Sequence, residues 1–176
     1  ALPIYNSDHH PQITALGSSG EFVVTWFGVD TEGRGRFGSP DFSIFVQKFN
    51  ADGSTTDQAM VKLEALGVTN GEDARSQITA IGSSGEFVVT WSGVDTGGDR
   101  SIFVQKFNAD GSTTGQAMVQ LEALGVTNGY DYEPQITAIG SSGEFVVTWT
   151  GSDTGGDYSI FVQKFNADGS TTGQAM

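Results

Sequence analysis

Apolar and polar residues alternate along short stretches of the chain, separated by segments rich in glycine, aspartate and asparagine. In EFVVTW (86–91), large apolar side chains occupy every second position, which is the pattern of a β-strand. SIFVQKFN (101–108) places isoleucine and valine on one face and two phenylalanines on the other. QITAI (77–81) predicts a strand before these two. QAMVQLEAL (116–124) predicts an edge strand after them, although its spacing also suits a short helix.

These segments recur in the same order along the whole chain. GSSGEFVVTW is identical at residues 17–26, 82–91 and 140–149, and SIFVQKFN begins at Ser43, Ser101 and Ser159, a repeat of 58 residues. The first copy carries seven additional residues between Trp26 and Ser43. We therefore expect a single repeat domain, 1–176, with units at about 1–66, 67–124 and 125–176.

Four short strands joined by Gly/Asp turns are typical of one blade of a β-propeller. The strings P-Q-I-T-A-[LI]-G-S-S-G-E-F-V-V-T-W and S-I-F-V-Q-K-F-N-A-D-G resemble blade repeats of large bacterial secreted and surface proteins, of the adhesin or RTX kind. The resemblance covers all three units and implies an extracellular or cell-surface location. The G-G-x-G-x-D nonapeptide that often accompanies such repeats does not occur in this chain.

Three blades are fewer than the four to eight with which propellers typically close. Repeat units need neighbours to bury their apolar faces. We therefore expect either self-association of two chains into a six-bladed ring or a place in a longer repeat array. The alternative all-β fold is a β-trefoil, in which three four-stranded units close within one chain.

The composition narrows the range of partners. The chain of 176 residues has a formal net charge of −13, which would repel nucleic-acid backbones, so we expect no nucleic-acid partner. We also expect no membrane span, because no apolar run approaches the length needed to cross a bilayer. Cysteine is absent, which excludes disulfides and thiolate nucleophiles.

Differences between the copies concentrate in two loops of each unit: the loop between the second and third strands, and the connection to the next unit. In an up-and-down blade these loops emerge at the same end, opposite to the invariant GSSG and NADGSTT turns. Exposed loops also vary when nothing selects their sequence, but binding residues are often carried on loops of a rigid scaffold. We expect a ligand site at this end, with side chains suited to stacking and multidentate hydrogen bonding: Arg34, Arg36, Phe37, Arg75, Arg100, Tyr130, Tyr132 and Tyr158.

Histidine occurs only at His9 and His10. Adjacent residues of an extended segment point to opposite sides, so we expect exposed loop residues rather than a shared metal site.

Aspartates recur at fixed places in each unit. One lies four residues after the tryptophan and one lies two residues before Ser-Ile, and calcium prefers such carboxylates on flexible loops. The calcium candidates are Asp30, Asp41, Asp95, Asp99, Asp153 and Asp157. Aspartate and glycine also form turns without any metal, which is the simpler interpretation.

No chemistry beyond binding is indicated. The chain contains no G-x-S-x-G motif, and threefold repetition of aspartates on loops does not suggest a pair of carboxylates facing across a cleft. We therefore expect a non-catalytic extracellular module that binds a ligand, in particular a carbohydrate, at its variable end. The alternative is a structural repeat that self-assembles into a closed propeller.

Overall fold

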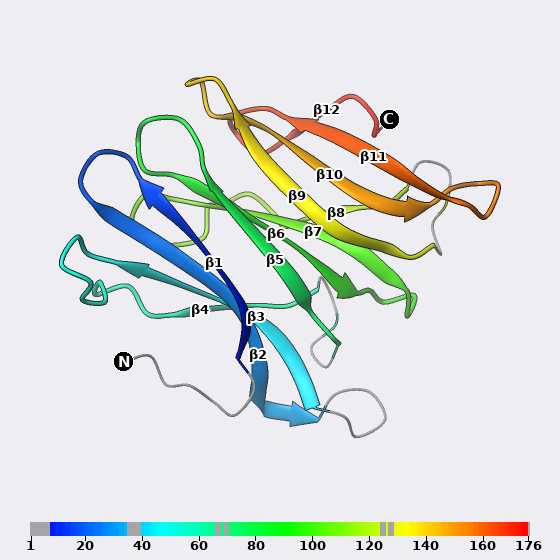
Figure 1. Ribbon diagram of the computed structural model, residues 1–176, viewed down its shortest axis with the longest axis horizontal. Coiled ribbons are helices and arrows are strands. Elements are labelled where there is room, and N and C mark those ends of the chain that lie inside the picture. The colour runs from blue at the N-terminus through cyan, green and yellow to red at the C-terminus, as the bar shows by residue number, and fades with distance from the viewer. Residues whose placement is uncertain are drawn as a thin grey trace.

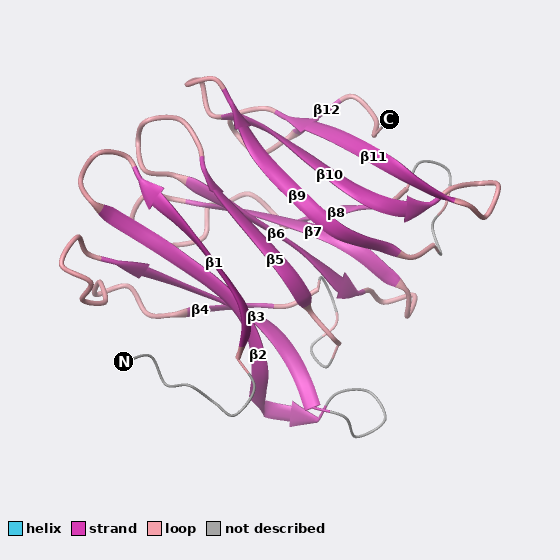
Figure 2. Ribbon diagram, in the orientation of Figure 1, coloured by secondary structure: helices cyan, strands magenta, loops and turns pink. Residues whose placement is uncertain are grey.

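The computed structural model describes residues 8–34, 40–65, 68, 71–123, 126 and 129–175, of which 30–34 and 40 are described by their backbone alone. It contains three four-stranded antiparallel sheets, each with its strands in chain order (Figures 1 and 2). The first sheet is formed by β1 (His9–Leu16), β2 (Glu21–Arg34), β3 (Pro40–Phe49) and β4 (Val61–Leu63). The second is formed by β5 (Ala74–Ala80), β6 (Phe87–Val94), β7 (Arg100–Phe107) and β8 (Val119–Leu121). The third is formed by β9 (Asp131–Ile139), β10 (Glu144–Ser152), β11 (Tyr158–Phe165) and β12 (Thr171–Thr172).

The sheets pack face to face, and β1, β5 and β9 lie side by side (Figure 1). Within the described ranges, only one β-pairing joins two different units. It is the isolated parallel bridge between Phe42 and Glu72. A trefoil requires strands of different units to share one barrel, so these separate sheets do not support that alternative. The all-β prediction of three four-stranded units is confirmed.

Each sheet presents two apolar faces of different composition. The Val/Ile face carries the valines and the isoleucine that alternate with the aromatic residues, and the Trp/Phe face carries the tryptophan and phenylalanines. Between the first two sheets, the Val/Ile face of the first packs on the Trp/Phe face of the second, and the core contains Val23, Ile44, Val46, Phe87, Trp91, Phe103 and Phe107. The same contact joins the second and third sheets through Val88, Ile102, Val104, Phe145, Trp149, Phe161 and Phe165. The second sheet is therefore buried on both faces.

Cross-strand aromatic pairs repeat in every unit. The rings of Phe87 and Phe107 stack at a centroid distance of 4.7 Å, and those of Trp91 and Phe103 stack at 5.8 Å. The register places each of these pairs directly opposite one another on β6 and β7. Equivalent pairs in the first and third sheets have centroid distances between 4.6 and 5.8 Å. The identical decapeptides therefore form identical cross-strand contacts.

In the second and third units, a buried aspartate forms hydrogen bonds both within its own sheet and to the backbone of the preceding unit. Oδ1 of Asp73 accepts a hydrogen bond of 3.0 Å from the indole N–H of Trp91, and Oδ2 accepts one of 3.3 Å from the backbone N–H of Ala65 in the preceding unit. Burial raises the pKa of Asp73 to about 8. Asp131 makes the same two contacts with Trp149 and Ala123. Burial, together with a hydrogen bond to Glu122, raises the pKa of Asp131 to about 7.

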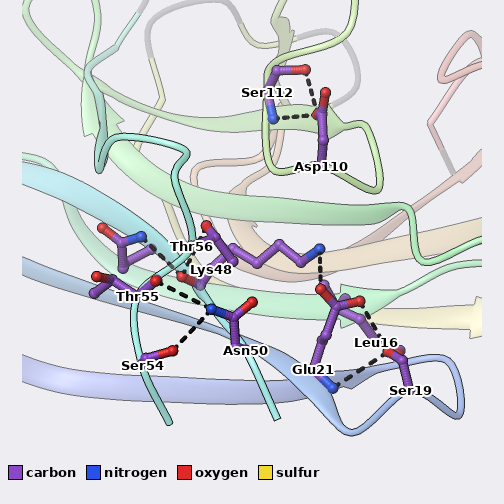
Figure 3. A network of polar contacts seen from close by, with 11 residues as sticks. Leu16, Ser19, Glu21, Lys48, Asn50, Ser54, Thr55, Thr56, Asp110 and Ser112 are labelled. Atoms are coloured by element: carbon purple, nitrogen blue, oxygen red, sulfur yellow. Dashed lines mark hydrogen bonds and ion pairs between the residues drawn. The ribbon is translucent and has the colours of Figure 1, made fainter. Parts of the chain in front are cut away.

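The invariant turns lie together at one end of the sheets. In the first unit, the ammonium group of Lys48 lies 2.7 Å from Oε1 of Glu21, and the hydroxyl of Ser19 donates to Oε2 of Glu21 at 2.9 Å (Figure 3). In the NADGS turn of the second unit, Asp110 accepts from both the N–H and the hydroxyl of Ser112 (Figure 3). The serine and aspartate side chains thus form hydrogen bonds in or beside the turns, and Lys48 and Glu21 join the two strands next to the first turn.

The fourth strands are shorter than the sequence predicts. β4 and β8 each contain three residues, and the residues at 116–118 lie outside the strand. In the third unit, β12 pairs Thr171 with Phe165. It occupies the place of the isolated bridges Phe49–Thr55 and Phe107–Thr113, rather than that of β4 and β8.

Candidate functional site

A cleft of about 1010 Å³ lies where β1, β5 and β9 begin. The turns between the first and second strands lie at the other end of these strands. The cleft is lined by residues from all three units, including segments 9–12, 74–77 and 133–135. The connections between units, which vary in sequence, therefore converge on one cavity.

The backbone at this cleft is distorted in the same way in each unit. His10, Arg75 and Glu133 have φ angles of 49°, 59° and 55°, and they are the only non-glycine residues with positive φ in the described part of the chain. They occupy equivalent positions, and the pairing between the first and second strands shifts register beside each of them. Non-glycine residues in this region cost about 1 kcal/mol or more and cluster at functional sites. Bulges of this kind re-aim side chains.

The residue at the bulge differs in every copy, whereas the residue two positions later does not. Gln12, Gln77 and Gln135 are equivalent, and all three line the cleft. An amide can both donate and accept hydrogen bonds. The cleft thus combines a constant set of three amides with a histidine, an arginine and a glutamate at the bulge positions.

Both arginines of the predicted site whose side chains the structure describes are ion-paired. Arg75 Nη1 lies 2.6 Å from Oε1 of Glu133, which links the second unit to the third. Arg100 Nη2 lies 2.6 Å from Oε2 of Glu72. Arg75, Arg100 and Tyr132 also line a smaller cavity of about 260 Å³. Arg75, Arg100 and Tyr132 therefore lie around one cavity, and each of these two guanidinium groups has a carboxylate beside it.

The tyrosines lie at the same end. The rings of Tyr132 and Tyr158 are in edge-to-face contact at 5.5 Å, and the side chain of Tyr130 is exposed. Burial raises the pKa of Tyr132, and so does the neighbouring Tyr158. Of the remaining predicted residues, Arg34 ends β2, whereas Arg36 and Phe37 lie outside the described residues.

The two histidines do not point to opposite sides, as an extended segment would require. The His9 and His10 rings lie 5.5 and 5.4 Å from the ring of Phe27, so both pack against one aromatic side chain. The left-handed conformation of His10 is the physical reason, because it rotates the second ring back toward the first. Phe27 in turn contacts Phe42 edge to face, and all four rings line the cleft.

The predicted calcium loops are tight turns organised by their first aspartate. Oδ1 of Asp95 accepts from the N–H groups of Gly97 and Gly98, and Oδ2 accepts from Gln120 and Ser101. Asp153 makes the corresponding turn in the third unit.

The second aspartate of the loop differs in its surroundings. In the second unit, burial and the Asp95 carboxylate raise the pKa of Asp99, whose Oδ2 is buried without a hydrogen-bond partner. Asp157 is exposed and Asp41 is buried, and the side chain of Asp30 lies outside the described residues. Among the residues that the structure describes, no group of three acidic or histidine side chains has metal-binding geometry. Calcium binding remains a prediction.

Sequence reasoning missed the residues that matter most to this architecture. Glu133, the three glutamines and the two phenylalanines of the cleft were not among the candidates. The buried aspartates Asp73 and Asp131 were missed as well, although both of them, like Asp8 in the first unit, precede the tryptophan of their unit by 18 residues. That constant spacing within an otherwise variable loop was the available signal.

Comparison with known proteins gives a fold but no family. No protein-family model and no curated protein sequence matches this chain. A solved structure described as an α-L-arabinofuranosidase from Lactobacillus brevis is similar, with a TM-score of 0.53 and 12% sequence identity over 96% of this chain. The chain spans about 55% of that protein's length. At this level of identity, the likeness between the two proteins extends to the all-β fold alone.

No helix in the described ranges is long and apolar enough to cross a bilayer.

Proposed function

We propose that this chain is a non-catalytic carbohydrate-binding module of propeller-type blades, which holds a neutral sugar in the cleft at the start of β1, β5 and β9. One observation carries the proposal: three equivalent left-handed bulge residues, different in each copy, line the same cleft. Strained backbone at a site of concentrated sequence variation favours a functional role over unselected loop drift. The resemblance of the repeats supports a secreted or surface protein.

The chemistry of the cleft suits sugar hydroxyls. Gln12, Gln77 and Gln135 supply donors and acceptors, and the paired Arg75 and Glu133 add one group of each kind. Phe27 supplies an aromatic surface of the kind that packs against apolar patches of a ligand.

A neutral glycan fits better than an acidic one. Arg75 and Arg100 are each paired with a glutamate at 2.6 Å, so neither presents an uncompensated positive charge. The whole chain is strongly acidic, which would also repel a polyanion. The similar solved structure is described as an arabinofuranosidase, and α-L-arabinofuranosyl oligosaccharides are therefore the first neutral sugars to try.

The test is a glycan-array screen followed by calorimetric titration of the best neutral oligosaccharide. We expect Arg75→Ala and Gln77→Ala to weaken binding by about tenfold or more, the loss typical of a hydrogen-bonding group in a site. Lys164→Gln is the matched control, because it removes a cation from a partly exposed ion pair with Glu144, distant from the cleft. Absence of binding to any neutral glycan, or equal losses for the control, would overturn the proposal.

A further inference from the structure

One apolar face of the third sheet is open, although its two counterparts are covered. Ile44 and Ile102 are 0% exposed, whereas the equivalent Ile160 is 67% exposed. Leu16 and Ile81 are buried, but their equivalent Ile139 is exposed. In the first two sheets the cover is the Trp/Phe face of the next sheet. The third sheet presents the same Val/Ile face with no sheet upon it.

The first sheet has the complementary open face. Ile13 is 66% exposed, whereas its equivalents Ile78 and Ile136 are partly buried against the adjacent sheet. Phe22 and Phe49 are half-buried, whereas their counterparts in the second and third sheets are fully buried. The first sheet thus presents a Trp/Phe face of the kind that elsewhere covers a Val/Ile face.

We propose that these two faces bind each other between copies of this chain, so that the Val/Ile face of the third sheet packs on the Trp/Phe face of the first sheet of a second copy. The same contact already occurs twice within the chain itself, between sheets one and two and between sheets two and three. The residues that make it are repeated at the open faces: Val146, Ile160 and Val162 on one side, and Ile13, Phe22 and Phe49 on the other.

The second copy is the partner that the surface chemistry favours. Both halves of the contact are present on every chain, so no other protein is needed. An interface between two different patches either closes into a ring or extends as a filament. Two copies of three sheets make six, which lies within the four to eight blades at which propellers close.

The charge of the chain predicts how this association depends on salt. Each copy has a formal net charge of −13, so two copies repel one another over long distances. Salt screens that repulsion, with a Debye length of about 10 Å at 0.1 M. The association should therefore be tighter at high ionic strength. Sulfate salts should tighten it further, because they also strengthen the burial of apolar surface.

Solution mass measured by light scattering tests the proposal directly. Over about 1–200 µM protein, a range that spans typical weak and moderate affinities, we expect the wild-type chain to reach twice its 18.5 kDa mass. Ile160→Gln and Ile13→Gln each place an amide at the contact and should weaken it about tenfold per interface, or ~100-fold for a ring with two interfaces. Both substitutions are at exposed positions, and thermal melting checks that the fold is retained.

Mixing the two variants distinguishes the proposed contact from a symmetric one. The Ile13→Gln chain keeps an intact Val/Ile face and the Ile160→Gln chain keeps an intact Trp/Phe face, so their mixture should recover one good interface. If identical faces paired instead, one of the single variants would remain dimeric, and that result would overturn the proposal. A wild-type chain that stays monomeric throughout the concentration and salt range would overturn it as well.

Tyr130→Gln separates this inference from the proposed sugar site. It removes a large exposed ring at the variable end and outside the two open faces, and it should leave the dimer mass unchanged. A loss of association in this control would show that the cleft end, rather than the open faces, forms the contact. Ile160 also lines the cleft, whereas Ile13 does not, so sugar binding is compared by calorimetry between the wild type and the Ile13→Gln chain. Either proposal can then fail without the other.

Discussion

The indole N–H of Trp91 donates a 3.0 Å hydrogen bond to Oδ1 of Asp73, a carboxyl group buried between the first and second sheets. The other oxygen of Asp73 accepts from Ala65, at the end of the first unit. One carboxyl group thus joins the core of its own sheet to the backbone of the preceding one. Because the same arrangement recurs at Asp131, the stacking of sheets depends on buried acids as well as on apolar packing.

Asp73 should make the chain less stable as the pH rises. Its pKa is about 8 in the folded chain, whereas an unperturbed aspartate has a pKa near 4. Between these values the unfolded state binds fewer protons than the folded state, so the free energy of unfolding falls as the pH rises from about 4 to 8. Asp131, with a pKa of about 7, acts in the same direction. Melting temperatures measured from pH 5 to 8 should decline.

Asp73→Asn removes the titrating group and keeps a carbonyl for the indole. It loses an acceptor for Ala65, so at pH 5 we expect a loss of about 1–3 kcal/mol, with a flatter dependence on pH than the wild type. Asp110→Asn is the control, because the hydrogen bonds from Ser112 lower the pKa of Asp110. That stabilisation is present above about pH 4 and constant from pH 5 to 8. The curve of stability against pH for Asp110→Asn should therefore be displaced from the wild-type curve without a change of slope. Parallel curves for Asp73→Asn and wild type would contradict the assignment.

Gly93 should tolerate no side chain. A Cβ there would collide with Oδ1 of Asp73 and would lie 3.0 Å from Cβ of Ala65, at the point where the two sheets are joined. We expect Gly93→Ala to lower the free energy of unfolding by about 2–3 kcal/mol, the cost of overpacking a dense core. At Gly115 a Cβ would meet nothing within 4 Å, so Gly115→Ala should change stability by less than about 0.5 kcal/mol. Urea denaturation checks both, and equal effects would contradict the close packing at Gly93.

The strands in which apolar side chains occupy every second position could be predicted from the sequence. Alternation on 86–91 and 101–108 identifies two strands and the composition of their two faces, and the structure buries both faces of the second sheet. The location of the variable loops at one end also follows from strand order. The extent of the fourth strands does not, because three residues of pairing leave almost no periodicity to detect.

The strained bulges could not be predicted because they have no local signature. A left-handed residue is expected to be glycine or asparagine, and here it is histidine, arginine or glutamate. The role of Asp73 is hidden for a different reason: an aspartate in a loop is ordinarily a turn former. Its burial arises from the packing of two sheets, and a single unit contains no information about that contact beyond the constant spacing to tryptophan.

Glycine at the bulge should be more stable than alanine. Arg75→Ala keeps a Cβ in the left-handed region, whereas Arg75→Gly relieves the strain, so we expect the glycine variant to be more stable by about 1 kcal/mol. Both lose the exposed pair with Glu133, which is worth at most about 1 kcal/mol, so the comparison isolates the backbone. Chemical denaturation of the two variants provides the measurement. Both should weaken sugar binding about tenfold or more. A glycine variant that is no more stable than the alanine variant would contradict the backbone strain at this position.

The Asp153 turn distinguishes a structural aspartate from a calcium ligand. Its Oδ1 accepts from the N–H groups of Gly155 and Asp157, and its Oδ2 accepts from the hydroxyl of Ser159, so Asp153→Ala should lower the melting temperature through loss of the turn. A turn role predicts the same decrease with calcium and with a chelator. A calcium role predicts that calcium raises the melting temperature of the wild type and that the variant loses this rise.

Asp168→Ala is the matched control for that comparison. Asp168 organises the NADGS turn of the same unit through Ser170 and was not a calcium candidate. We expect its melting temperature to fall by a similar few degrees in both buffers, because it removes turn hydrogen bonds of the same type. If Asp153→Ala and Asp168→Ala respond identically to calcium, the aspartates after the tryptophans are turn residues. A calcium-dependent difference confined to Asp153→Ala would establish the loop 153–157 as a cation site.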